Sequence, residues 1–364
     1  MQPFVYEALP ARVVFGSGTV AQLRSEAERL GVRRVLVLST PGRGEAQARE
    51  IAALLGDLAV GVYAGAVMHT PVEATETALE VVRELAADAL VAIGGGSTTG
   101  LGKAVALRTD LPQIVLPTTY AGSEMTPILG ETKDGVKTTQ RTPKVLPEVV
   151  IYDVDLTMGL PAAITATSGM NAMAHAVEAL YARDRNPVIS LMAEEGIRSL
   201  ARALPGIVDD PQDREGRADA LYGAWLCGAC LGAVGMALHH KLCHVLGGTF
   251  DLPHAETHTI VLPHAVAYNA PAAPDAMERI TRALGVPDAA QGLFELAERL
   301  GAKRALRDIG MPAHGIERAV QAALAAPYWN PRPLEEGGLR DLLMRAWNGD
   351  PPQARSRREG SSRA

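Results

Sequence analysis

Histidines are concentrated in one stretch of the chain. Six of the nine fall within 26 residues, at His239, His240, His244, His254, His258 and His264. A uniform distribution would place fewer than one histidine in an interval of that length. Imidazole exchanges protons, donates hydrogen bonds and binds metals near neutral pH, so this density indicates a chemical site.

Two pairs of polar residues have the spacing of one helix face. His240 and His244 lie four residues apart, and so do Asn171 and His175 in the helical pattern SGMNAMAHAVEALYA. Residues at this spacing lie one above the other on a helix. We therefore expect the two pairs, together with His254 after a short loop, to converge between helices.

A glycine-rich turn lies upstream, at Gly94–Thr99 (GGGSTT), between the apolar run Ala89–Ile93 and the helical pattern Leu101–Leu107. Glycines at such a turn let a phosphate approach the backbone, where free amides and the helix dipole stabilise the anion. The turn is neither GxGxxG nor a Walker sequence. Its position at the end of a parallel strand still predicts phosphate binding rather than an empty turn. The expected ligands are Gly94, Gly95, Gly96, Ser97 and Thr98, with Ser97 or Thr98 capping the helix or donating to phosphate.

A second polar segment, PTTYAGSE at Pro117–Glu124, follows the next apolar run. Small hydroxyl residues there would lie beside the glycine turn at the same sheet edge. Thr118, Thr119 and Ser123 are the expected cofactor ligands, and an ordinary polar loop is the alternative.

The surrounding pattern changes character near residue 155. Before it, apolar runs typical of buried parallel strands alternate with helical patterns, at Val35–Ser39, Ala59–Tyr63, Ala89–Ile93, Gln113–Pro117 and Val149–Tyr152. Residues 130–142 are polar and predict a hairpin or loop. After it, helical patterns dominate, at Pro161–Ala182, Val188–Ala203, Arg217–Leu238, Pro274–Leu284, Gln291–Leu300 and Gly315–Ala325. We expect an α/β domain at 1–158, an all-α domain at 159–349 and a disordered tail at 350–364.

Composition excludes several classes of protein. The 364 residues are 47% hydrophobic and carry a net charge of −6 with 4% aromatics, which disfavours disorder and nucleic-acid binding. Leu221–Leu238 has no charge, but its many Gly and Ala residues favour a packed core helix over a membrane span. We expect a cytoplasmic protein without nucleic-acid or membrane partners.

The three cysteines raise the alternative of a thiol–disulfide redox protein. Cys227 and Cys230 form a CxxC, but they lie inside an apolar helical pattern rather than at a helix start. Buried structural cysteines are therefore expected instead of a thiol–disulfide site.

Taken in order from Phe15 to His264, the motifs GGGS, TTYAGSE, SGMNAMAHAVEA and HHKLCHVLGGTFDLPHAETHTIVLPH resemble the iron-containing (group III) alcohol dehydrogenase superfamily. The resemblance implies a dehydroquinate synthase-like fold, with an N-terminal Rossmann-like nucleotide-binding domain and a C-terminal helical domain. It also implies NAD(P) and substrate in the cleft between them.

The departures from the superfamily pattern point to one subgroup. The metal ligands of relatives correspond to Asn171, His175, His240 and His254, so a neutral amide replaces an aspartate. Gly100 replaces the acid of GGGSxxDxxK, whereas Lys103 is retained. These forms resemble the maleylacetate reductases. Three histidines can still hold zinc, so the change disfavours a metal site and leaves it open as an alternative.

The resemblance implies the NAD(P)H-dependent reduction of the carbon–carbon double bond of maleylacetate to 3-oxoadipate, in the degradation of aromatic compounds. Hydride addition β to a ketone leaves an enolate that hydrogen-bond donors can stabilise, so no metal is expected. His244 is the leading catalytic candidate. His175, His240 and His254 are expected to stabilise the enolate or bind substrate, with Asn171 also binding substrate. A metal-dependent (Fe or Zn) alcohol dehydrogenase is the alternative.

Three further expectations concern the choice of cofactor, the histidines outside the motifs and the assembly. Ser39 and Thr40 stand where an acid would exclude NADP, so either NADH or NADPH can serve. His239 and His258 occupy no motif position and are expected to lie outside the site. A homodimer is the expected assembly.

Overall fold

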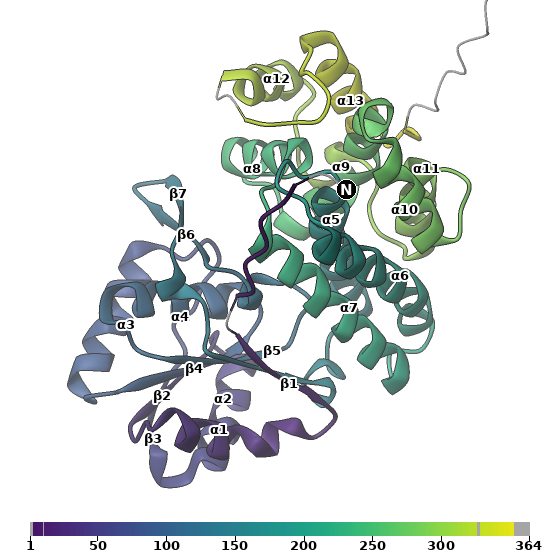
Figure 1. Cartoon of the computed structure of the whole chain (residues 1–364). Helices are drawn as coiled ribbons and strands as arrows, with labels where there is room; N and C mark the ends of the chain where they lie inside the picture. Colours follow the sequence, from purple (N-terminus) through teal and green to yellow (C-terminus); the bar gives the residue numbers. More distant parts are fainter. Residues whose placement is uncertain (1–2, 10, 326–327, 353–364) are drawn as a thin grey trace, which may run out of the picture.

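A six-stranded parallel sheet forms the centre of the N-terminal part of the protein (Figure 1). The computed structural model describes residues 3–9, 11–325 and 328–352. The strands are β1 (Arg12–Gly16), β2 (Val35–Leu38), β3 (Ala59–Tyr63), β4 (Ala89–Gly94), β5 (Gln113–Pro117) and β8 (Val149–Asp153), in the sheet order β1-β8-β5-β4-β2-β3. The predicted parallel sheet is confirmed, with β1 as an additional edge strand.

Four helices cover the sheet, two on each face (Figure 1). They are α1 (Leu23–Leu30) and α2 (Arg43–Leu55) on one face, and α3 (Val72–Glu84) and α4 (Gly96–Thr109) on the other. In β2, Val35 and Val37 pack on the α1–α2 side, whereas Leu36 and Leu38 pack on the α3–α4 side. Successive strand side chains point to opposite faces, which explains why a sheet covered on both sides needs continuous apolar strands.

The polar segment at 130–142 belongs to an antiparallel hairpin, β6 (Ile128–Lys133) and β7 (Val136–Arg141). Its two-residue turn, Asp134-Gly135, has positive φ angles of 51° and 75°. Asp-Gly is a favoured pair for such a turn, because its twist matches that of the flanking strands. The hairpin expectation is confirmed.

Among the described residues, the C-terminal part contains helices and connecting loops but no strand. Its helices are α5 (Ala162–Leu180), α6 (Pro187–Asp209), α7 (Arg214–Ala233), α8 (Leu238–Phe250), α9 (His254–Asn269), α10 (Pro274–Leu284), α11 (Ala289–Arg299), α12 (Gly315–Ala325) and α13 (Glu336–Asn348). Buried side chains of α5, α6 and α7 form one large apolar core, and a second core joins α8, α9, α12 and α13. Residues 353–364 of the expected tail lie outside the described residues.

The helix predicted at Arg217–Leu238 is wrong at its C-terminal end. Helix α7 ends at Ala233, and α8 starts at Leu238 with a bend of 93° between α7 and α8. Among the described residues, no single helix is long and apolar enough to cross a membrane, and only this bent pair passes together. Cys227, Cys230 and Cys243 are free and buried, as expected of structural cysteines.

Candidate functional site

The glycine turn lies at the carboxyl end of β4, where the sequence predicts it. Gly94 has φ +151°, a conformation that side-chain-bearing residues rarely adopt. A Cβ atom added to Gly95 would lie 2.9 Å from Oγ1 of Thr119, so a side chain there would require the Thr119 side chain to move. Gly94 is therefore required by the local backbone, whereas Gly95 leaves room between the turn and the second polar segment, Pro117–Glu124, called the second loop below.

Helix α4 begins at Gly96 with Gly95 as its N-cap, and no side chain caps it. Of the two alternatives for Ser97 and Thr98, capping of the helix is therefore wrong, and donation to a phosphate stays a prediction. Thr98 is buried, and its hydroxyl has no hydrogen-bond partner. Helix N-termini leave their first amides without partners inside the helix, and an anion satisfies them well. This end of the sheet can thus receive a phosphate.

The second loop lies beside the glycine turn, as expected. The Thr118 amide donates to the Gly94 carbonyl at 3.0 Å, and Gly94 pairs with Pro117 in the β4–β5 register. Thr118, Thr119 and Ser123 are all partly exposed. Predicted cofactor residues from two separate motifs are therefore brought to one sheet edge.

Lys103, the residue retained from the GGGSxxDxxK motif, fixes the second loop through hydrogen bonds. Its fully buried Nζ donates to the carbonyl oxygens of Ser123, Thr126 and Ile128 at 2.5, 2.7 and 2.9 Å. Burial lowers the pKa of Lys103 to about 7, and the nearby Glu124 carboxyl opposes that shift. The contacts give this residue a role in shaping the loop that the sequence left unassigned.

Three glycines join the second loop to the helical part of the molecule. A Cβ atom on Gly228 would lie 2.9 Å from the carbonyl oxygen of Gly122, and one on Gly232 would lie 2.5 Å from that of Met125. A Cβ atom on Gly122 would in turn lie 3.4 Å from Nδ1 of His175. The GxxxG pair of α7 therefore packs against a loop of the α/β domain, and this contact brings His175 next to the second loop.

The predicted histidines come from three neighbouring helices. His175 lies on α5, His240 and His244 lie on α8, and His254 opens α9. The rings of His175 and His240 stack with centroids 5.1 Å apart, and those of His240 and His244 are 6.4 Å apart. The two helical pairs therefore meet through His175 and His240.

Polar atoms without partners mark the buried side of this group. Oδ1 of Asn171, Nδ1 of His175 and Nε2 of His240 are buried and make no hydrogen bond. Burial, followed by the neighbouring histidines, holds the pKa of His175 well below its usual range. His244 and His254, in contrast, are exposed. The histidine cluster thus contains the buried, neutral imidazole of His175 together with the imidazoles of His244 and His254, which solutes can reach.

Glu178 is a site residue that the sequence analysis missed. Its fully buried carboxylate accepts hydrogen bonds from three backbone amides at the start of α8, and its Oε2 lies 2.8 Å from Nδ1 of His240. The only signal in the sequence is its place three residues after His175, on the same side of α5. A glutamate in a helical pattern is normally read as solvent-exposed.

His239 and His258 lie beside the cluster, so the expectation that they stand apart is wrong. Both are fully buried, and Nε2 of His239 lies 3.0 Å from Nδ1 of His258. The His258 ring centroid is 4.3 Å from that of His254 and 5.0 Å from that of His240. Burial holds the pKa of both His239 and His258 well below the usual range.

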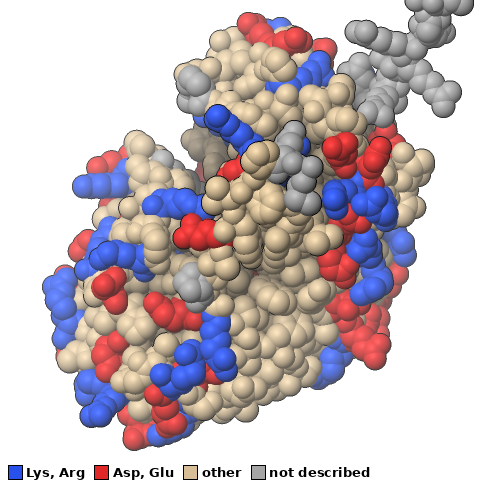
Figure 2. All heavy atoms as spheres, in the orientation of Figure 1, with Lys and Arg blue, Asp and Glu red and all other residues tan. Residues whose placement is uncertain are grey.

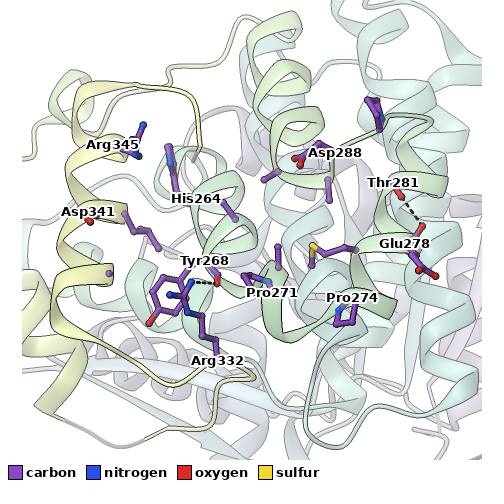
Figure 3. A pocket seen from close by; sticks show the side chains of 18 of the residues that line it. His264, Tyr268, Pro271, Pro274, Glu278, Thr281, Asp288, Arg332, Asp341 and Arg345 are labelled. Atoms are coloured by element: carbon purple, nitrogen blue, oxygen red, sulfur yellow. Dashed lines mark hydrogen bonds between the residues drawn. The ribbon is translucent and has the colours of Figure 1, made fainter. Parts of the chain in front are cut away.

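His264 does not join the other histidines. It lines a cavity of about 1010 Å³ among α9, α10, α11 and α13, together with Tyr268, Arg332 and Arg345 (Figure 3). None of the site residues predicted from the sequence lines this cavity. The density of histidines in the sequence therefore overstates the number that meet at one place.

The residues at the metal positions of the family do not form a compact ligand set here. Asn171 offers a neutral amide oxygen in place of a carboxylate. Among the described residues, His239, Cys243 and His258 are the group of three whose ligand atoms lie within 4.8 Å of one another. The buried nitrogens of His239 and His258 already contact each other, and neither residue stands at a family metal position. The donor set at Asn171, His175, His240 and His254 therefore fits a divalent cation poorly.

The surface is hollowed between the β6–β7 hairpin and the α8–α12 end of the helical part (Figure 2). On the visible face, acidic and basic side chains are interspersed rather than gathered into regions of one sign (Figure 2). This agrees with the modest net charge of −6.

Both parts of the chain match one protein family. Residues 10–154 match the iron-containing alcohol dehydrogenase family, and residues 165–347 match the C-terminal part of the Fe-containing alcohol dehydrogenase family. A maleylacetate reductase from Rhizobium sp. (strain MTP-10005) is 58% identical over 97% of this chain and 100% of that protein. One from Sphingobium indicum is 60% identical over 96% of this chain and 99% of that protein.

Solved structures agree with these relatives. A crystal structure of maleylacetate reductase from Agrobacterium tumefaciens has 58% identity and a TM-score of 0.94, and covers 97% of this chain and 100% of that one. A putative alcohol dehydrogenase from Ralstonia eutropha JMP134 has 60% identity and a TM-score of 0.95 with the same coverage. The family resemblance seen in the motifs and the predicted two-part fold are confirmed, and the chain belongs to the iron-containing alcohol dehydrogenase family.

Proposed function

We propose that this protein reduces the carbon–carbon double bond of maleylacetate to 3-oxoadipate, with NADH or NADPH as hydride donor and without a catalytic metal. The observation that carries the proposal is the identity of 58–60%, over almost the whole chain, to proteins named maleylacetate reductase. Asn171 supports the absence of metal, because a neutral amide does not balance the charge of a divalent cation as a carboxylate does.

The cofactor would bind at the edge of the sheet formed by the two loops. The uncapped start of α4 suits its pyrophosphate, and Gly94, Gly95 and Gly96 leave room for it. Ser97, Thr98, Thr118, Thr119 and Ser123 supply hydroxyl donors nearby. The bound nicotinamide supplies a hydride. Ser39, buried at the end of β2 with an unpartnered hydroxyl, carries no charge that would repel a 2′-phosphate, so either cofactor is acceptable.

The histidines would stabilise the negative charge that develops on the substrate when it accepts the hydride. Addition at the carbon β to the ketone produces an enolate, whose oxygen needs hydrogen-bond donors. His244, exposed and next to His240, is the proposed donor and the source of the proton for the adjacent carbon. His175, His240, His254 and Asn171 are proposed to bind the two carboxylates or to stabilise the enolate.

The decisive experiment follows NAD(P)H oxidation with maleylacetate before and after exhaustive chelation. We expect full activity in both samples and 3-oxoadipate as the product. Activity that is lost on chelation and restored by zinc or iron, with oxidation of simple alcohols, would favour the metal-dependent alternative. The cytoplasmic location and the homodimer stay part of this proposal, and light scattering on the purified enzyme tests the dimer.

A further inference from the structure

One buried threonine has a backbone conformation that the local structure does not require. Among the described residues, the non-glycine residues with left-handed φ are His69, Thr70, Ala86, Asp110, Asp134 and Asp251. The last four follow a helix or turn the β6–β7 hairpin, where such angles are common. His69 lies in a turn, but Thr70, with φ 47°, lies in none and precedes α3. A β-branched residue in this conformation is strained, and such strain gathers at functional sites.

The segment that carries Thr70, residues 64–71, is attached to the β6–β7 hairpin. The Thr132 amide donates to the Thr70 carbonyl at 3.2 Å, and the Thr132 hydroxyl donates to the His69 carbonyl at 3.1 Å. Pro71 also pairs with Thr132 as an isolated parallel bridge. These contacts use backbone groups of the segment, so glycine at position 70 would keep them. They explain how the strained conformation is held, but not why the side chain there is a threonine.

The side chain of Thr70 fills the space beside Gly100. A Cβ atom on Gly100 would lie 2.4 Å from Oγ1 of Thr70, so a side chain at position 100 and this hydroxyl exclude each other. Gly100 stands where the superfamily motif GGGSxxDxxK carries an acid. The buried Thr70 hydroxyl therefore occupies the place at which that acidic side chain would begin.

Position 100 belongs to the end of α4 that can receive a phosphate. Gly96, the first residue of α4, and Gly100 lie four residues apart and share one face of the helix. Side chains on a helix tilt toward its N-terminus, so one at position 100 would lie over the turn that Gly96 opens. Thr70 brings its hydroxyl to this face from a separate segment. Residues 64–71 therefore reach the sheet edge at which the glycine turn and the second loop meet.

We propose that the Thr70 hydroxyl is a ligand of the bound dinucleotide, beside its pyrophosphate. A hydroxyl can donate to a phosphate oxygen and can accept from a ribose hydroxyl. Unlike an acid at position 100, it adds no negative charge next to the phosphates. The strained φ is retained because it directs this group at the cofactor. The proposal deepens the proposed function and rests on the NAD(P)H binding that it includes.

The test compares Thr70→Val, which keeps the shape of the side chain, with Thr70→Ser, which keeps the hydroxyl. Fluorescence titration of each full-length variant with NADH and NADPH measures Kd. We expect Kd to rise by about three- to tenfold in Thr70→Val, the loss typical of one hydrogen bond, and Thr70→Ser to bind more tightly than Thr70→Val. Thr70→Gly should show a similar rise in Kd yet be at least as stable as the wild type, because glycine adopts this φ without strain.

Two control variants separate strain from cofactor binding. Ala86→Gly relieves a φ of 45° after α3, at the amino edge of the sheet, and should leave Kd unchanged. Gly100→Ala should raise Kd because its Cβ atom displaces the Thr70 hydroxyl. Combined with Thr70→Gly, the same alanine meets no hydroxyl, and it should then cause no loss of stability.

The outcomes are distinct for this contact and for the proposed function. Wild-type Kd in Thr70→Val, or equal losses in Thr70→Val and Thr70→Ser, would overturn the contact. Should Thr70→Val fail to fold, wild-type Kd in Thr70→Gly would overturn it as well. The expected shifts of Kd in an enzyme that does not reduce maleylacetate would refute the proposed function and leave the cofactor contact intact.

Discussion

Replacing Gly228 by alanine should separate the second loop from the histidine cluster. The new Cβ atom would lie 2.9, 3.0 and 3.3 Å from the O, Cα and C atoms of Gly122, all closer than an ordinary contact of 3.4 Å or more. These are backbone atoms, so no flexible side chain can turn away. We therefore expect α7 and the loop to move apart by about 0.5 Å, the difference between 2.9 and 3.4 Å.

Two opposing effects set the size of the response. Overpacking at a buried contact costs about 1–3 kcal/mol, whereas exchanging Gly for Ala within a helix gains about 1 kcal/mol. The net loss of stability should be about 0–2 kcal/mol, so the protein stays folded. The kinetic effect should be larger, because misplacement of about 1 Å can cost 10²-fold in rate. Since Gly122 also approaches His175, we expect kcat/KM to fall by about tenfold.

Steady-state kinetics with maleylacetate, combined with thermal unfolding, measures both effects. Gly337→Ala in α13 is the control, because nothing lies within 4 Å of the atom it adds. It should leave kinetics unchanged and stability unchanged or higher. A Gly228→Ala enzyme with wild-type kcat/KM would refute the view that this glycine contact sets the geometry of the site.

Three further predictions concern the loops and the histidines. Gly95→Asp should weaken NAD(P)H binding in a folded protein, because its side chain meets Thr119 and brings a negative charge to the phosphate position; unchanged affinity by titration would remove the turn from the site. His244→Ala should lower kcat by about 10²–10⁴-fold, whereas His175→Ala, His240→Ala and His254→Ala should mainly raise KM, and NADPH affinity should change little in all four. The free energy of unfolding should fall as pH drops below about 6.5, because His239 and His258 take up protons in the unfolded chain but stay neutral when buried in the folded protein. Denaturation curves for His258→Gln should show a smaller fall than the wild type. An identical pH dependence of the two proteins would contradict this prediction.

The sheet was predictable because its signal is local. Runs such as Ala89–Ile93 and Gln113–Pro117 are apolar throughout, and the structure places both as strands within one residue of their predicted ends. The edge strand Arg12–Gly16 was not predicted, because it is short, begins with a charged residue and is only partly buried. The other edge strand, Ala59–Tyr63, was predicted because its run carries no charge.

The details of the site were less predictable because distant contacts set them. The break between α7 and α8 has no proline, and it is stabilised by Glu178 and by Asp184, whose carboxylate accepts from the Gly235 amide at 3.0 Å. The separation of His264 likewise depends on how α9 packs. Helical spacing predicts which residues share a face, but it does not tell which neighbour that face meets.

Helix α5 shows how these contacts combine. Asn171, His175 and Glu178 follow one another at helical spacing and are all buried. The carboxylate in this series therefore stands behind His240, while the position that holds a metal ligand in relatives carries a neutral amide. Helix α5 therefore carries the changed metal position, one ring of the histidine cluster and the carboxylate that contacts His240. Because these three residues share one face of a helix, the packing of α5 against α8 determines where all of them lie.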